Sequence, residues 1–426
     1  MESDQILGDA GSRIDRIRKG DAALTLKLPP GTAACAGAPL RIEQTNHAFR
    51  FGGGILYRSH ESDFDPEFAR QFIHLFNFAT ILFHWGTSPL YRGNFGYENT
   101  RDRPLEQDRR TQARWCADNG ILAKGHALLF KREPAWLQKL PFEEMEKAYD
   151  RRLRREIGTF RGMVDCWDVV NEPTNMKRDA APASERFIAE LYARYSITEI
   201  MKRSYETARE ANPAATLLVN DYDTSDAYRD VVARSLDAGV GLDAVGIQSH
   251  MTGGVWSPGT TWETCERFRT LGLPLHLTEV SLPSGAPSGR AKFNWAARTP
   301  DWISTPEGEQ LQAEEAAAFY TVLFSHPAVQ AITWWDFSDA STFLDAPIGL
   351  LRRDFSPKPS YLALERLIRH DWMTTLETRL PASGTVNLRG FFGDYAVRTE
   401  INGRPYRGVF ALPPSAGPAT LDVQLA

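Results

Sequence analysis

The stretch Val164-Asp-Cys-Trp-Asp-Val-Val-Asn-Glu-Pro173 decides the fold class, because it is a short apolar run that ends abruptly in polar residues. Asn171 and Glu172 close the run, and Pro173 cannot continue a strand because it has no backbone N–H to donate. A buried strand that ends in this way places an amide and a carboxylate at its carboxyl end.

Seven further apolar runs occur along the chain, and long amphipathic stretches separate them. The eight runs are Phe51–Ile55, Phe78–Phe83, Ile121–Leu129, Val164–Val170, Ala215–Val219, Ala244–Ile247, Leu275–Thr278 and Val329–Trp334. Helical patterns between them cover Phe142–Phe160, Glu185–Ala211 and Gly308–Ser325. Eight β-then-α units over roughly 320 residues predict an α/β fold of the TIM (β/α)8 barrel type. A doubly wound open sheet fits less well, because no glycine-rich GxGxxG turn follows the first run.

The two ends of the chain have a different pattern, with short alternating runs that are typical of β-strands. Residues 13–50 are interpreted as β structure, and four further alternating runs follow Thr385. Neither end alone has enough strands to bury a core. We therefore expect residues 1–50 and 371–426 to combine into one small β-sandwich-like module, beside a catalytic barrel formed by residues 51–370.

Composition narrows the classes of partner. The chain has 426 residues, with 49 Lys and Arg against 54 Asp and Glu and a net charge of −5, so neither nucleic acid nor an anionic membrane is expected as a partner. No apolar stretch reaches about 18 residues. The start of the sequence lacks signal-peptide features, which predicts a cytoplasmic protein, or a secreted or periplasmic one if a leader has been removed. The four cysteines are far apart and predict neither disulfides nor a metal site.

Two carboxylates are expected to meet at the mouth of the barrel. In this fold the active site lies at the carboxyl ends of the strands, where run four ends in Glu172 and run seven ends in Glu279. Glycoside hydrolysis needs such a pair, one carboxyl protonated and the other ionised, and the retaining mechanism needs about 5–5.5 Å between them. The alternative is that both are structural, each paired with an arginine or capping a helix.

Six motifs, in order along residues 50–370, resemble those of glycoside hydrolase family 10, the xylanase family. They are Gly125-His-Ala-Leu-Leu129 on strand three, Trp167-Asp-Val-Val-Asn-Glu-Pro173 on strand four, Asn220-Asp-Tyr222 on strand five, Gly246-Ile-Gln-Ser-His250 on strand six, His276-Leu-Thr-Glu279 on strand seven, and Thr333-Trp-Trp335 with Pro357-Lys-Pro-Ser-Tyr361 on strand eight. A single tripeptide is a weak signal, whereas six in order are a strong one.

The resemblance implies a role for each matching residue. Glu172 becomes the general acid/base and Glu279 the nucleophile, with the pKa of Glu172 expected to be raised by the second carboxylate. The remaining implied sugar-contacting or orienting residues are Asn171, His126, Gln248, His250 and Trp335. His250 is expected to orient Glu279, and Asn171 to contact the 2-hydroxyl. For His126 and His250 the alternative is a satisfied core histidine, and for Trp335 it is barrel filling.

The sequence departs from the family pattern on the non-reducing side of the site. The family has Glu-Asn-x-x-Lys-Trp on strand two where this chain has Thr80–Trp85, and Trp-His-x-Gln after strand three where it has Phe130–Glu133. The family's second tryptophan over the cleft falls at Phe343. Each polar partner lost weakens xylose binding by about 1 kcal/mol or more. Trp85, the retained tryptophan of the strand-two motif, and Phe343 are expected to contact the substrate, and replacement contacts are expected from His84, Lys131, Arg132 or Glu133. The two cations fit an acidic sugar, or else they pair with Glu133.

The segment Val280–Thr305 is long for a loop between a strand and a helix, and it carries Phe293, Trp295 and Trp302. It is interpreted either as a lid over the cleft or as a loop whose aromatics anchor it to the barrel.

The sequence as a whole predicts a retaining β-glycosidase that cleaves a xylan-type polysaccharide or oligosaccharide, without metal or other cofactor. It indicates no oligomeric state. The alternatives are the same chemistry on another β-linked glycan or small glycoside, and a carbohydrate-binding barrel without turnover.

Overall fold

Eight parallel strands close into a barrel in the computed structural model, as predicted. The structure describes residues 2–30, 36–56, 65–86, 98–100, 103–104, 106–131, 133–175, 185–252, 254–285, 302–340, 342, 345–414 and 417–426. The barrel strands are β3 (Arg50–Gly54), β4 (Phe78–Leu82), β7 (Leu122–Leu129), β8 (Val164–Asn171), β9 (Thr216–Asp221), β10 (Ala244–Ile247), β11 (Leu275–Val280) and β12 (Val329–Trp334). A short hairpin, β5 (Glu98–Thr100) and β6 (Arg103–Pro104), lies outside the barrel.

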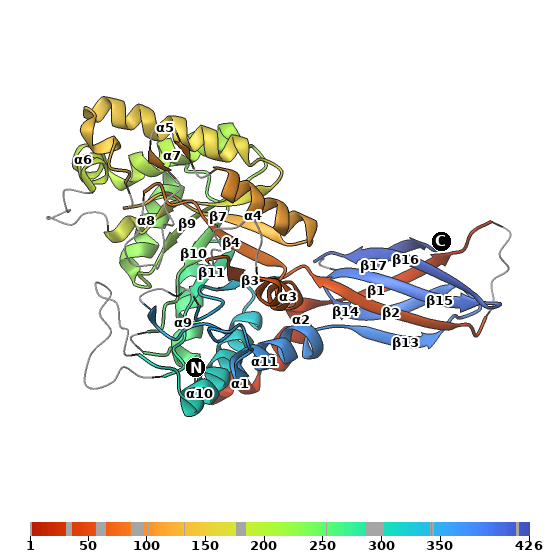
Figure 1. Cartoon of the computed structure of the whole chain (residues 1–426). Helices are drawn as coiled ribbons and strands as arrows, with labels where there is room; N and C mark the ends of the chain where they lie inside the picture. The colour runs from red at the N-terminus through yellow and green to blue at the C-terminus, as the bar shows by residue number, and fades with distance from the viewer. Residues whose placement is uncertain are drawn as a thin grey trace.

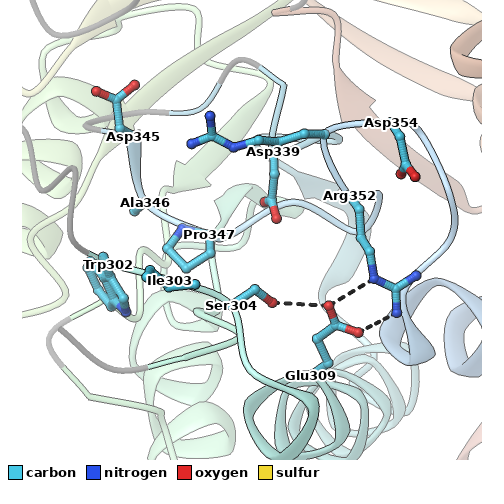
Figure 2. A pocket seen from close by; sticks show the side chains of 11 residues that line it. Trp302, Ile303, Ser304, Glu309, Asp339, Asp345, Ala346, Pro347, Arg352 and Asp354 are labelled. Carbon is cyan, nitrogen blue, oxygen red and sulfur yellow. Dashed lines mark hydrogen bonds and ion pairs between the residues drawn. The ribbon is translucent and has the colours of Figure 1, made fainter. Parts of the chain in front are cut away.

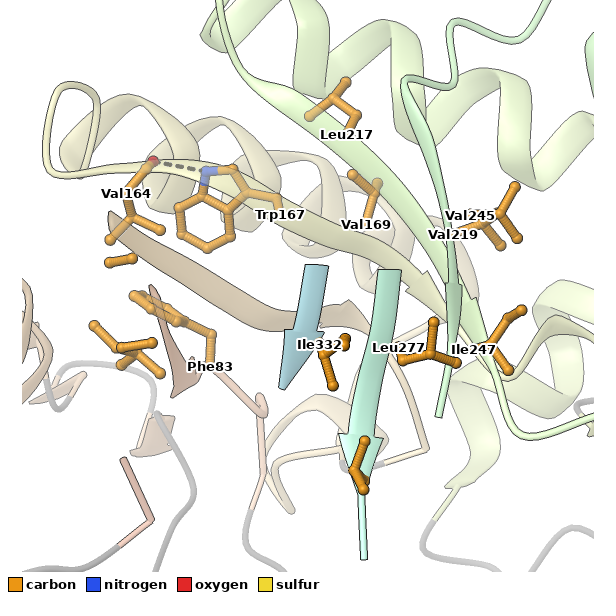
Figure 3. Packing of buried hydrophobic residues seen from close by; sticks show 14 of the residues in the cluster. Phe83, Val164, Trp167, Val169, Leu217, Val219, Val245, Ile247, Leu277 and Ile332 are labelled. Carbon is orange, nitrogen blue, oxygen red and sulfur yellow. Dashed lines mark hydrogen bonds between the residues drawn. The ribbon is translucent and has the colours of Figure 1, made fainter. Parts of the chain in front are cut away.

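The barrel strands are buried over almost their whole length, which explains why they are continuous apolar runs. Their aliphatic side chains pack with aromatic ones in one large core (Figure 3). Trp167 is fully buried there, and its Nε1 donates to the carbonyl of Val164 at 2.9 Å. Its ring lies against Gly125 on the neighbouring strand, where a Cβ atom would collide with it.

Helices follow the strands around the barrel, in the order that the amphipathic patterns predict. They are α3 (Pro66–Leu75), α4 (Glu106–Asp118), α5 (Phe142–Thr159), α6 (Arg186–Arg194), α7 (Ile197–Ala211), α8 (Asp226–Asp237), α9 (Pro258–Arg269), α10 (Pro306–Phe324) and α11 (Pro359–Arg366). The single helical pattern predicted over Glu185–Ala211 is wrong, because it contains two helices. Ser196 starts α7 with a reciprocal capping box to Glu199, which ends the preceding helix.

Strands from the two chain ends interleave in a two-sheet module, as predicted (Figure 1). Its strands are β1 (Lys19–Lys27), β2 (Pro39–His47), β13 (Thr375–Arg379), β14 (Thr385–Phe391), β15 (Gly393–Ile401), β16 (Arg404–Leu412) and β17 (Ala419–Gln424). N-terminal β1 lies between β14 and β17, and N-terminal β2 lies between β13 and β15. Because each sheet needs strands from both ends, neither end forms the module alone.

The β interpretation that began at residue 13 is wrong for its first residues. Helices α1 (Ser3–Gly8) and α2 (Ala10–Arg18) precede β1, and both contact barrel helix α10. Arg18, at the end of α2, donates to the carbonyls of Phe324, His326 and Val329 at 2.7–2.8 Å. This buried guanidinium therefore joins the start of the module to the barrel. The predicted domain boundaries at residues 50 and 370 stay predictions.

None of the described helices combines the length and the apolarity needed to cross a membrane. Cys116, Cys166 and Cys265 are buried free thiols, whereas Cys35 lies outside the described residues.

Candidate active site

Glu172 lies immediately after β8, at the carboxyl ends of the barrel strands. Its backbone has a φ of 53°, in the left-handed region that is unfavourable for a residue with a side chain, and its N–H donates to the carbonyl of Asn220 at 2.7 Å. Three donors surround the carboxylate at 3.3–3.4 Å: Lys131 Nζ and Asn175 Nδ2 at Oε2, and Gln248 Nε2 at Oε1. The side chain remains 15% exposed, so a ligand in the barrel mouth can reach it.

Glu279 lies in β11, three places from β8 around the eight-strand ring, and is more deeply buried. Asn220 Nδ2 donates to its Oε1 at 2.8 Å, and His250 Nε2 lies 3.0 Å from its Oε2. Burial alone would raise the pKa of Glu279, but His126, His250 and Lys124 together outweigh burial and hold that pKa below its usual value. The site therefore keeps this carboxylate ionised.

Three side-chain amides connect the two glutamates. Asn220 Nδ2 bridges Glu279 and Asn171 Oδ1, both at 2.8 Å, and Gln248 Nε2 bridges Asn171 Oδ1 and Glu172 at 3.4 and 3.3 Å. These amides come from β8, β9 and the end of β10, which are neighbours in the barrel. The strand order thus brings both predicted catalytic residues into one hydrogen-bonded network, which we call the amide network (Asn171, Asn220 and Gln248).

His126 sits below this network in a buried set of charges. Its Nδ1 lies 2.8 Å from Asp168 Oδ2, which also accepts from Lys124 Nζ at 2.6 Å, and its Nε2 lies 3.8 Å from Glu279 Oε1. Burial opposes ionisation of Asp168, but Lys124 and His126 outweigh it and lower its pKa. The anionic Asp168 therefore fixes the orientation of the His126 ring that faces Glu279.

Aromatic side chains border the same site. The ring centroid of Trp335 lies 5.1 Å from that of His126 and 6.2 Å from that of His250. The ring centroid of His84 is 5.3 Å from those of both His126 and Phe130. The structure thus brings His84, Trp335 and both predicted site histidines to one side of the barrel mouth.

Two positions behave differently from the prediction. Trp85 lies in the hydrophobic core of the barrel wall, 6.1–6.4 Å from the rings of Trp136, Tyr149 and Phe187. Glu133 accepts hydrogen bonds from the backbone N–H groups of Phe187 and Ile188 at 3.0 and 2.7 Å, at the start of α6. Neither side chain is directed at Glu172 or Glu279. Phe343, Arg132, Phe293 and Trp295 lie outside the described residues.

Burial raises the pKa of Glu133 to about 7, although the two backbone N–H groups oppose the shift. Burial also raises the pKa of Asp221 to about 6, and the nearby charge of Glu172 adds to the rise. Asp221 accepts from the N–H and the hydroxyl of Thr174 at 3.1 and 2.8 Å, so it fixes the turn that follows Glu172.

Lys124 and Asp168 belong to the site but are not among the residues predicted from the sequence, although the sequence carries a signal for both. Lys124 and Asp168 are charged residues inside the otherwise apolar runs of β7 and β8, which marks them as inward-facing partners. Asn220 belongs to the strand-five motif, but no sequence feature indicates that it contacts both Asn171 and Glu279. Lys131 was predicted as a substrate contact, and the structure adds its ion pair with Glu172.

A cavity of about 520 Å³ lies beside the loops that follow β11 and β12 (Figure 2). Glu309 and Arg352 form a two-point ion pair in its wall, at 2.5 and 3.0 Å. Trp302 also lines it, and its Nε1 donates to the carbonyl of Gly285 at 2.7 Å. For Trp302, therefore, the anchoring interpretation of the 280–305 loop holds. Glu172 and Glu279 do not line this cavity.

Comparison with characterised proteins gives several relatives of similar identity. The chain is 24% identical over 409 residues to anti-sigma-I factor RsgI6 of Acetivibrio thermocellus, covering 94% of this chain and 47% of that protein. It is 22% identical to endo-1,4-beta-xylanase 2 of Arabidopsis thaliana, covering 96% and 35%. It is 25% identical to endo-1,4-beta-xylanase B of Thermotoga neapolitana, covering 67% and 78%. The chain thus spans less than half the length of the first two relatives.

Solved structures show the same fold. Xylanase 10B of Thermotoga petrophila, determined in complex with xylobiose, matches with a TM-score of 0.61 at 20% identity, covering 76% of this chain and 95% of that one. A GH10 structure from Paenibacillus barcinonensis matches with a TM-score of 0.60 at 22% identity, covering 75% and 94%. The model of glycosyl hydrolase family 10 matches residues 97–366, which is more than half of the chain. With its barrel and its two strand-end glutamates, the chain belongs to glycosyl hydrolase family 10.

Proposed function

We propose that this protein is a retaining β-glycoside hydrolase that acts on xylan-type chains, with Glu279 as nucleophile and Glu172 as general acid/base. The observation that carries the proposal is the amide network, which ties both carboxylates to the same set of side chains at the strand ends. Family membership supports the reaction class, and relatives named as xylanases support the substrate class.

The chemistry follows from the different surroundings of the two carboxylates. Glu279, held ionised, attacks the anomeric carbon while Glu172 gives a proton to the departing glycosidic oxygen. The resulting glycosyl ester is then attacked by water, which passes a proton to Glu172, and Glu279 leaves as a carboxylate. Two inversions leave the anomeric configuration unchanged.

The proposed substrate contacts divide into two groups. His126, Asn171, Gln248, His250 and Trp335 surround the carboxylates and serve the sugar that is cleaved. On the non-reducing side the family's polar set on strand two is absent, and His84 and Lys131 stand nearby instead. We therefore propose that the cleavage chemistry is that of the family and that the adjoining sugar site is built differently.

The test compares Glu279→Gln and Glu172→Gln with the wild type on aryl β-xylobiosides, alongside aryl β-glucosides and β-glucuronides. Glu279→Gln should reduce turnover to background. Glu172→Gln should reduce kcat/KM about 10²–10⁴-fold for poor leaving groups and far less for nitrophenol, whose departure needs no proton. Glu377→Gln, an exposed carboxylate in the module, is the matched control. NMR of the first-formed product should show a retained β-anomer.

An inverted product, or near wild-type turnover by Glu279→Gln, would contradict the assignment. Tight binding of xylo-oligosaccharides by the wild type without any product would instead support a carbohydrate-binding barrel.

A further inference from the structure

Lys131 is a cation placed directly beside the proposed acid/base. Its Nζ lies 3.4 Å from Glu172 Oε2, and both side chains are 15% exposed. This ion pair is long, since charge-assisted bonds of this kind are usually about 2.7–2.9 Å. The ammonium group thus lies in the barrel mouth and makes only this long contact with Glu172 among the ion pairs described for it.

The neighbouring charge that could have neutralised Lys131 is committed elsewhere. Glu133, two residues along, binds the backbone at the start of α6 and is directed away from the site. Gln248 and Asn175, the other side chains at the Glu172 carboxylate, are neutral donors. Among the groups described at this carboxylate, Lys131 therefore carries the positive charge that an anionic ligand would meet.

We infer that Lys131 recognises the carboxylate of an acidic sugar, a uronic acid carried by the xylan chain next to the bond that is cleaved. The inference rests on the proposed function and names its substrate class. An ammonium in a partly desolvated pocket attracts a carboxylate more strongly than one in water.

The same ammonium also faces the proposed acid/base. In the free site Lys131 Nζ lies 3.4 Å from Glu172 Oε2. A substrate carboxylate that binds Lys131 therefore competes with Glu172 for one ammonium group. Acidic substrates should gain in kcat/KM.

The experiment measures kcat/KM for xylotetraose and for the same oligosaccharide carrying one glucuronic acid, at low salt and at 0.5 M NaCl. The wild type should prefer the acidic substrate about fivefold or more, and salt should reduce the preference. Lys131→Gln should abolish the preference, measured as the ratio of the two kcat/KM values within the same variant, and Lys131→Arg should keep part of it. Lys147→Gln removes an equal charge from the exposed ion pair with Glu144 and should change nothing.

Equal rates on both substrates, or a preference that survives Lys131→Gln, would overturn the inference and leave the proposed function intact. If neither substrate is cleaved, the proposed function fails, and calorimetric binding of the same two oligosaccharides tests the inference separately. Equal affinities in the wild type and in Lys131→Gln would then overturn it.

Discussion

Replacing Asn220 by alanine tests whether the amide network positions the nucleophile. Asn220 is fully buried, and its single Nδ2 donates to both Glu279 Oε1 and Asn171 Oδ1 at 2.8 Å. Its Oδ1 in turn accepts from the hydroxyl of Thr278 at 2.6 Å, which fixes the direction of the amide. Truncation to alanine removes these bonds without adding bulk or charge.

The size of the effect follows from the bond to the carboxylate. A hydrogen bond to a charged group contributes about 1.5–3 kcal/mol, and every 1.36 kcal/mol of barrier is a factor of ten in rate. If the bond serves the transition state, kcat should fall about 10- to 150-fold in Asn220→Ala. KM for a xylo-oligosaccharide should change less, because Asn220 is fully buried and binds Glu279 and Asn171.

The assay is steady-state kinetics on an aryl β-xylobioside, with thermal unfolding in parallel. Asn212→Ala is a matched control, because Asn212 is equally buried and donates to Asp165 at 2.6 Å, but it precedes β9 at the opposite end of the barrel. Both variants should lose stability, and Asn220→Ala alone should lose kcat. Equal losses of kcat in the two variants would show that Asn220 acts through stability and would refute this reasoning.

Three further predictions concern other parts of the chain. Glu133→Gln should remove a pH dependence of stability. A carboxyl whose pKa is raised in the folded state destabilises the fold as pH rises from about 4.5 to about 7, so the Tm of the variant relative to the wild type should increase over that range. A difference in Tm that does not change with pH would contradict this. Gly246→Ala would place a Cβ 2.5 Å from Asn220 Oδ1, so kcat should fall about tenfold or more and Tm should also fall; kinetics well below the Tm of the variant, on protein shown to be folded, would contradict this if kcat were unchanged. Arg18→Met leaves three buried carbonyls without their donor and should cost about 3 kcal/mol or more in urea unfolding, whereas exposed Arg398→Met should cost less than about 0.5 kcal/mol.

The barrel could be predicted from the sequence because its strands are buried on both faces, so each is a continuous apolar run. The errors fell where a pattern allowed two interpretations. Ile14 and Ile17 are three residues apart, a helical spacing, yet they were included in the β segment. The break between α6 and α7 had a visible signal in Ser196 and Glu199, but the amphipathic pattern continues across it. Local capping chemistry, rather than hydrophobic periodicity, sets these boundaries.

Only the part of the candidate site that lies at the strand ends could be predicted from the sequence. Glu172 and Glu279 could be found because strand ends mark the barrel mouth. Residues beyond a strand end follow no period, so the direction of a side chain such as Glu133 is set by its contacts. Glu133 binds the start of α6, whereas Lys131, two positions earlier, faces Glu172. The sequence alone could not separate these two outcomes.

The order of the barrel strands explains how the proposed cleavage centre can resemble the family while the proposed sugar site beside it differs. Glu172, Asn220, Gln248 and Glu279 come from β8 to β11, four consecutive strands whose side chains hold one another. The departures fall on β4 and on the segment after β7. Substitutions there change which groups meet the sugar, while the bonds from Asn220 and His250 that fix Glu279 stay in place. Effects at the two sides should therefore be close to additive, except at Lys131, whose contact with Glu172 joins the two sides.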